Sequence, residues 1–106
     1  MIAITSAPVR VCVRGDMRFV AGFATDVPGI VIVPYHDQAG HWLIGLAESG
    51  YGIPPASFAS PELAAEFLGR IADFTDWTRS LEEISTDREL AARVARAWRV
   101  WQTEGM

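Results

Sequence analysis

The hydrophobic period of this 106-residue sequence changes once, at the pair Pro54-Pro55. Before the pair, short apolar runs alternate with polar or turn residues, as β-strands do. After it, apolar residues recur every three or four positions, the period of an α-helix. Because the strand patterns precede the helix patterns, we predict an α+β domain, with helices packed on an antiparallel sheet. The predicted elements are four or five strands within residues 9–53 and two or three helices, at about 61–74, 81–85 and 87–102, in one domain spanning residues 1–106.

The first predicted hairpin joins residues 9–14 to residues 17–23, where Met17, Phe19, Ala21 and Phe23 share one face. A two-residue turn at Gly15-Asp16 and a three-residue loop over 14–16 are the alternatives. Only the loop sets Val13 opposite Met17 and Val11 opposite Phe19. The apolar pattern therefore favours the three-residue loop.

The second predicted hairpin joins residues 30–35 to residues 41–47, and both of its strands are apolar on both faces. Such strands are either covered on both sides or keep one face for a partner, and a homodimer through that face is one of the alternatives. Residues 49–53 can add a short edge strand, which Pro54 and Pro55 would end because proline cannot donate to a ladder.

Three sequence signals predict where the helices begin. Ser60-Pro61-Glu62 combines a hydroxyl cap with proline at the first helical position. Ser80 with Glu83, and Thr86 with Glu89, match the capping box. Gly69, in the interior of the first helix, predicts close packing there, since glycine is otherwise unfavourable in a helix.

Composition restricts the class of protein. The single cysteine, Cys12, excludes an internal disulfide and a zinc site built on several thiolates, and it indicates a reducing compartment. The sequence has neither a signal-peptide pattern nor an 18-residue apolar run, so we expect a cytoplasmic protein without membrane contact. A net charge of −4 excludes a strongly basic nucleic-acid clamp.

Catalytic groups are few. His36, Asp37 and His41 are close in sequence, but their spacing matches no known metal motif, and an aspartate in a glycine-ended loop is typical of turn geometry. Cys12 lies between valines, as a small buried residue would, rather than as a nucleophile beside a histidine. We therefore expect no enzyme activity, no metal and no cofactor, with a hydrolase or metal enzyme at the histidines as the disfavoured alternative.

Two groups of residues could bind macromolecules. The aromatic content is high for this length, and interfaces favour aromatic side chains, which predicts a partner-binding set of Trp77, Trp101, Tyr51 and Tyr35. For Trp77 and Trp101 the core rim and an interface are equal alternatives. The last helix carries Arg93, Arg96 and Arg99 on its outer face, which indicates nucleic-acid contact as the alternative function.

Residues 41–74 place a strand, a glycine turn and the segment Ser57-Phe58-Ala59-Ser60-Pro61-Glu62 before a helix. This order resembles the sheet-plus-helix, arm-type DNA-binding domains of phage integrases, which implies a similar shape over a third of the chain. Those domains read DNA with basic side chains on the sheet, whereas residues 19–69 here contain no arginine or lysine. With its arginine-only basic residues, the whole chain also resembles short uncharacterised phage and plasmid proteins of GC-rich actinobacteria.

These observations together predict a small non-enzymatic interaction module, a regulator, inhibitor or adaptor encoded by a phage or mobile element. Its expected partner is another protein, with a homo-oligomer as an open alternative.

Overall fold

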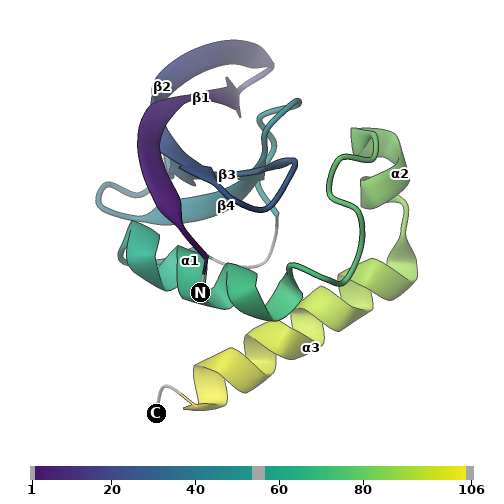
Figure 1. Cartoon of the computed structure of the whole chain (residues 1–106). Helices are drawn as coiled ribbons and strands as arrows, with labels where there is room; N and C mark the ends of the chain where they lie inside the picture. Colours follow the sequence, from purple (N-terminus) through teal and green to yellow (C-terminus); the bar gives the residue numbers. More distant parts are fainter. Residues whose placement is uncertain (1, 54–56, 105–106) are drawn as a thin grey trace.

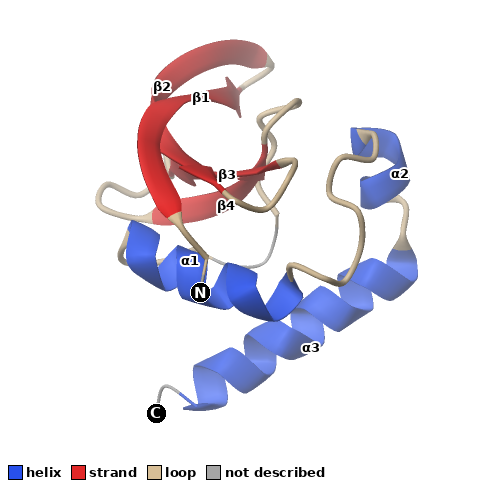
Figure 2. Ribbon diagram, viewed as in Figure 1, coloured by secondary structure: helices blue, strands red, loops and turns tan. Residues whose placement is uncertain are grey.

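The computed structural model describes residues 2–53 and 57–104 and confirms the α+β architecture (Figure 1). Within these residues a four-stranded antiparallel sheet, in the order β1-β2-β3-β4, precedes three helices (Figure 2). The elements are β1 (Ile4–Val13), β2 (Asp16–Thr25), β3 (Ile30–Pro34), β4 (Trp42–Leu46), α1 (Pro61–Ile71), α2 (Leu81–Ser85) and α3 (Arg88–Glu104). None of the described helices is long and apolar enough to span a membrane.

The main core lies between the sheet and the helices. Helix α1 packs against β3 and β4, and α3 crosses α1 on the side away from the sheet (Figure 1). Ile32 and Ile44 of the sheet meet Phe67, Leu68 and Ile71 of α1, and all five side chains are almost fully buried. The apolar stripe of α1 is therefore buried by the sheet on one side and by α3 on the other.

A second, smaller core explains why β3 and β4 are apolar on both faces. The β1–β2 hairpin curls over the sheet, and Val9 and Val11 pack against Val33 on the face that does not contact α1. The chain packs closely around Gly22, where a Cβ atom would lie only 2.3 Å from Val9 Cγ2. Of the two alternatives for the second hairpin, the structure shows coverage on both sides by the chain itself.

The predicted register of the first hairpin is wrong. The turn has two residues, Arg14 (φ 52°) and Gly15 (φ 83°), and it sets Val13 opposite Asp16 and Val11 opposite Arg18. Two successive positive φ values match the twist of a tight hairpin, which a longer loop would not need. The prediction assumed that the valines of β1 and the apolar residues of β2 share a face, but Val9 and Val11 are buried whereas Met17 and Phe19 are exposed.

The helix signals are confirmed at two of three starts. The hydroxyls of Ser60 and Ser80 accept hydrogen bonds from the backbone N–H groups of Leu63 (3.1 Å) and Glu83 (3.2 Å). The predicted cap at Thr86 is wrong: Asp87 caps α3 by accepting from the Leu90 N–H at 3.0 Å. Thr86 instead ends α2 and donates its hydroxyl to the Glu82 carbonyl at 2.8 Å.

Two further details differ from expectation. Helix α1 ends at Ile71. Gly69 is exposed, and among the described residues its Cβ would meet only Ile2 Cγ1, at 3.7 Å. Close packing is thus not the reason for this glycine. In place of a fifth strand, Gly52 forms a single bridge to Gly45. The predicted strand end at Pro54 and Pro55 lies outside the described residues.

Candidate interaction surface

The outer side of the β1–β2 hairpin carries exposed apolar side chains. Phe19 and Met17 are 68 % and 50 % exposed, although both are large and apolar. The register places Arg10 opposite Phe19 and Cys12 opposite Met17, so these side chains share one face. We call this surface the hairpin face, made of Pro8, Arg10, Cys12, Met17, Phe19 and Ala21.

Local geometry holds the hairpin face in place. The Arg10 guanidinium lies over the Phe19 ring, 5.4 Å from its centroid, and its Nη1 donates to the Glu48 carbonyl at 2.7 Å. The Cys12 N–H donates to the Gly50 carbonyl at 3.2 Å. Gly50 has φ 76°, and a Cβ there would lie 2.8 Å from the Val11 carbonyl carbon, so this close approach of β1 to the 47–50 turn requires glycine.

Tyr51, one of the predicted partner-binding residues, extends the hairpin face. Its side chain is 49 % exposed, and a hydrogen bond with the Cys12 thiol is the main reason why the pKa of its hydroxyl is raised. Tyr35 lies apart from it, half-buried in the β3–β4 connection, with its ring edge-on to His36 at 5.8 Å. The structure therefore brings only Tyr51 to the hairpin face.

Trp77 is a core residue and is removed from the partner-binding set. It is 3 % exposed, and its indole N–H donates to the Ala72 carbonyl at 3.1 Å. The loop after α1 presses it against the 27–29 turn so closely that a Cβ on Gly29 would lie 2.4 Å from the Trp77 carbonyl oxygen. Sequence reasoning placed Trp77 in a polar loop, but the loop folds inward over the sheet.

Trp101 is half-buried at the far end of α3 from Trp77. Its ring is edge-on to Phe67 at 5.7 Å, and the Arg70 guanidinium covers it at 5.1 Å from the ring centroid. Arg70 also forms two hydrogen bonds with the Glu104 carboxylate, at 2.6 and 2.5 Å, and these hold the pKa of Glu104 below its usual range. Neighbouring side chains thus already cover much of Trp101.

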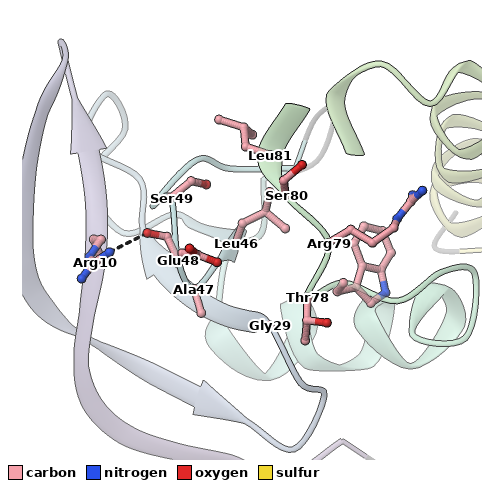
Figure 3. A pocket seen from close by; sticks show the side chains of 11 residues that line it. Arg10, Gly29, Leu46, Ala47, Glu48, Ser49, Thr78, Arg79, Ser80 and Leu81 are labelled. Carbon is pink, nitrogen blue, oxygen red and sulfur yellow. Dashed lines mark hydrogen bonds between the residues drawn. The ribbon is translucent and has the colours of Figure 1, made fainter. Parts of the chain in front are cut away.

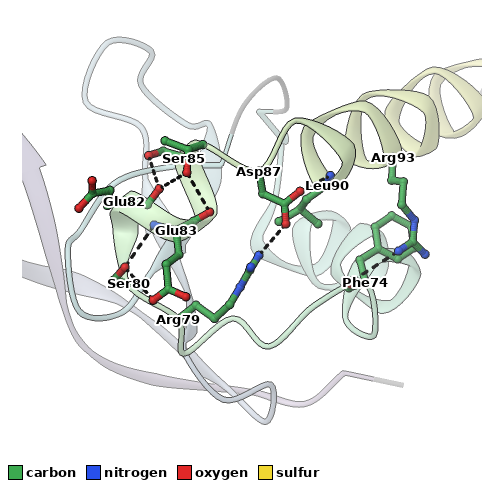
Figure 4. Close-up of polar contacts among 10 residues, drawn as sticks. Phe74, Arg79, Ser80, Glu82, Glu83, Ser85, Asp87, Leu90 and Arg93 are labelled. Carbon is green, nitrogen blue, oxygen red and sulfur yellow. Dashed lines mark hydrogen bonds and ion pairs between the residues drawn. The ribbon is translucent and has the colours of Figure 1, made fainter.

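The three arginines predicted as a nucleic-acid site have different surroundings. Arg93 stacks on Phe74 at 4.2 Å and donates to the Phe74 carbonyl at 3.5 Å, as Figure 4 shows. Arg96 and Arg99 are exposed on α3. One of the three charges is therefore engaged with the chain's own surface.

The polar side chains of the histidine loop form two local pairs. His36 Nε2 lies 3.3 Å from Asp37 Oδ1, and His41 Nε2 lies 3.1 Å from the Gln38 amide nitrogen. Across residues 2–53 and 57–104, no three metal-ligating side chains come together. Cys12 is turned to Tyr51 and lies on the hairpin face, and it lines a hollow of about 290 Å³ together with His36.

A cleft of about 630 Å³ separates the β4 end of the sheet from the segment that leads into α2 (Figure 3). Arg10 and Glu48 line one wall, and Thr78, Arg79 and Ser80 line the other. Arg79 is not free to bind a ligand with its full guanidinium, since Nη2 donates to Asp87 at 3.0 Å (Figure 4). The Ser80 hydroxyl on the cleft wall donates to the Glu83 carboxylate at 3.1 Å.

No protein-family model, curated protein or solved structure matches this chain.

Proposed function

We propose that this chain is a non-enzymatic protein-interaction module that binds another protein through the hairpin face. The observation that carries the proposal is the exposure of Phe19 and Met17 on one face of β2. Burying one such side chain against a partner is worth roughly 1.5–3 kcal/mol. Apolar patches of this kind, bordered by polar groups, are typical of protein-binding sites.

The polar surroundings fit an interface as well as the apolar centre does. Arg10 and Tyr51 flank the patch, and arginine and tyrosine are enriched at interface hot spots because they combine a large contact area with hydrogen-bonding tips. Since Arg10 is already held by Phe19 and the Glu48 carbonyl, little side-chain entropy is lost when a partner covers it. A regulator, inhibitor or adaptor needs no more than such a surface.

The test is affinity capture with the tagged full chain from its own host, followed by titration with the partner so identified. The wild-type chain should retain a stoichiometric protein, and Phe19→Ser should lose it. Val100→Ser is the matched control, because Val100 is 48 % exposed on α3, away from the hairpin. Unfolding curves of both variants should coincide with the wild type.

Two results would contradict the proposal. One is a partner that Phe19→Ser retains as strongly as Val100→Ser does. The other is salt-sensitive retention of nucleic acid that Arg96→Glu abolishes, which would place function on the outer face of α3 instead.

A further inference from the structure

Strand β2 leaves one of its edges open beside the hairpin face. It pairs with β1 along its whole length, but with β3 only through Phe23 and Ala24. The strands β2 and β3 then separate. Arg18 and Val20 of β2 face a hollow of about 290 Å³, which is also lined by residues 11–13 of β1, by Val33 of β3 and by the 50–52 segment. Five residues, 17–21, thus have no strand on their second side within the described parts of the chain.

The direction of the backbone groups follows from the register. The Cys12 N–H points away from β2, toward the Gly50 carbonyl, so the pair Cys12–Met17 exchanges no ladder bonds. By alternation, Met17, Phe19 and Ala21 direct their N–H and C=O groups away from β1. The open edge therefore offers three donors and three acceptors in the spacing that an added strand requires.

The outer edge of β1, on the other side of the hairpin, is protected, and in this it differs from the open edge of β2. On β1, Pro8 lacks an N–H group, and Cys12 is already bonded to Gly50. On β2, no proline or lysine interrupts residues 17–21. An edge strand whose backbone N–H and C=O groups are unpaired is a template to which another chain can add a strand.

The charge of the hairpin indicates which kind of segment would bind along the open edge of β2. Residues 9–20 contain Arg10, Arg14 and Arg18 but only one acidic residue, Asp16, a net charge of +2 in a chain of net charge −4. Arg18 lies on the side of β2 that faces the hollow, and its ion pair with Asp16 is long (3.8 Å) and exposed. A second copy of this chain would bring two basic hairpins together, whereas an acidic segment would be attracted.

We propose that the partner adds an extended segment as a strand along residues 17–21 of β2, with apolar residues facing Met17, Phe19 and Ala21 and an acidic residue opposite Arg18. This inference rests on the proposed function, because it assigns the binding mode of the same surface. Antiparallel addition gives an apolar–any–apolar–acidic–apolar pattern from the N-terminus of the segment, since side chains alternate between faces. Backbone hydrogen bonds supply affinity, and the alternating side chains supply specificity.

The probe is a synthetic capped peptide, Thr-Ile-Thr-Val-Glu-Val-Thr, titrated into the ¹⁵N-labelled full chain, with the same peptide carrying Lys in place of Glu as the control. The Glu peptide should shift the amide signals of Met17, Phe19 and Ala21 saturably. The Lys peptide should bind about threefold to tenfold more weakly, since like charges across a strand pair repel. In Arg18→Glu the preference should reverse, and this variant leaves every backbone group in place.

The backbone is tested separately. Ala21→Pro removes one outward N–H that has no partner in the fold, and it should weaken the Glu peptide at least threefold, whereas Ala21→Ser should not. Equal binding of the two peptides, signal shifts that map elsewhere, or no shift at the highest peptide concentration would overturn the proposal. So would a doubled light-scattering mass that Ala21→Pro abolishes, because the occupant would then be a second copy.

The two proposals fail in different ways. A natural partner that needs Phe19 but binds Ala21→Pro as well as Ala21→Ser would leave the proposed function standing and overturn strand addition. A natural partner that binds Phe19→Ser as strongly as the wild type would overturn the proposed function, whether or not the peptide binds.

Discussion

Replacing Trp77 by alanine should remove much of the protein's free energy of unfolding, rather than only weaken binding to a partner. A tryptophan buried to this extent removes roughly 150–250 Å² from water, and truncation of a buried aromatic residue to alanine costs about 3–5 kcal/mol once the cavity is included. The Ala72 carbonyl also loses the indole hydrogen bond. Because domains of this size have total stabilities of about 5–15 kcal/mol, we expect the midpoint of thermal unfolding to fall by roughly 12–30 °C.

The assay is urea unfolding followed by far-ultraviolet circular dichroism, since four tryptophans would complicate fluorescence. Trp77→Phe keeps most of the apolar volume and loses the indole donor, so it should cost about 1–2 kcal/mol. Phe19→Ala is the exposed control and should change stability by no more than about 0.5 kcal/mol. A loss below about 1 kcal/mol for Trp77→Ala would refute the assignment of this residue to the core.

Three further predictions concern the backbone and pH. Gly22→Ala should destabilise the protein by about 1–3 kcal/mol, because the new methyl group would overlap Val9 where β2 bends, and a normal unfolding curve would show that the bend can relax. Gly69→Ala should stabilise it by about 0.5–1 kcal/mol, because the site is open and alanine favours a helix, and the same unfolding assay checks the sign. Stability should fall as pH drops below about 4, and Asp87→Asn should flatten this decline. The Leu90 N–H and then Arg79 lower the pKa of Asp87 in the folded state, so protonation favours the unfolded chain; an unchanged acid profile in that variant would contradict the assignment.

The elements that local chemistry specifies were predictable from the sequence. The change of hydrophobic period predicted four or five strands before two or three helices, and the structure has four strands followed by three helices. The hydroxyl caps at Ser60 and Ser80 predicted two helix starts. The Thr86 cap failed because Thr86 and Asp87 can both cap, and the choice depends on where α2 ends. That end is set by contacts with the rest of the fold, so local pattern alone could not decide it.

The sequence predicted which residues of the candidate surface share a face, but not which of them are exposed. Alternation correctly placed Met17, Phe19, Ala21 and Phe23 on one face of a strand. It could not show that the hairpin curls over the sheet, so that Phe23 packs on Trp42 at 5.4 Å while Phe19 stays in solvent. Trp77 is the opposite case. Its polar neighbours in the loop indicated an exposed or partly exposed side chain, but the fold buries it.

Local sequence therefore determined which residues form strands and helices, because hydrophobic period, caps and turn residues act over a few positions. Only the tertiary structure decided which apolar faces are covered, because coverage depends on the curvature of the sheet and on segments distant in the sequence. The open edge of β2 is of this second kind: it exists because β2 and β3 separate after two paired residues.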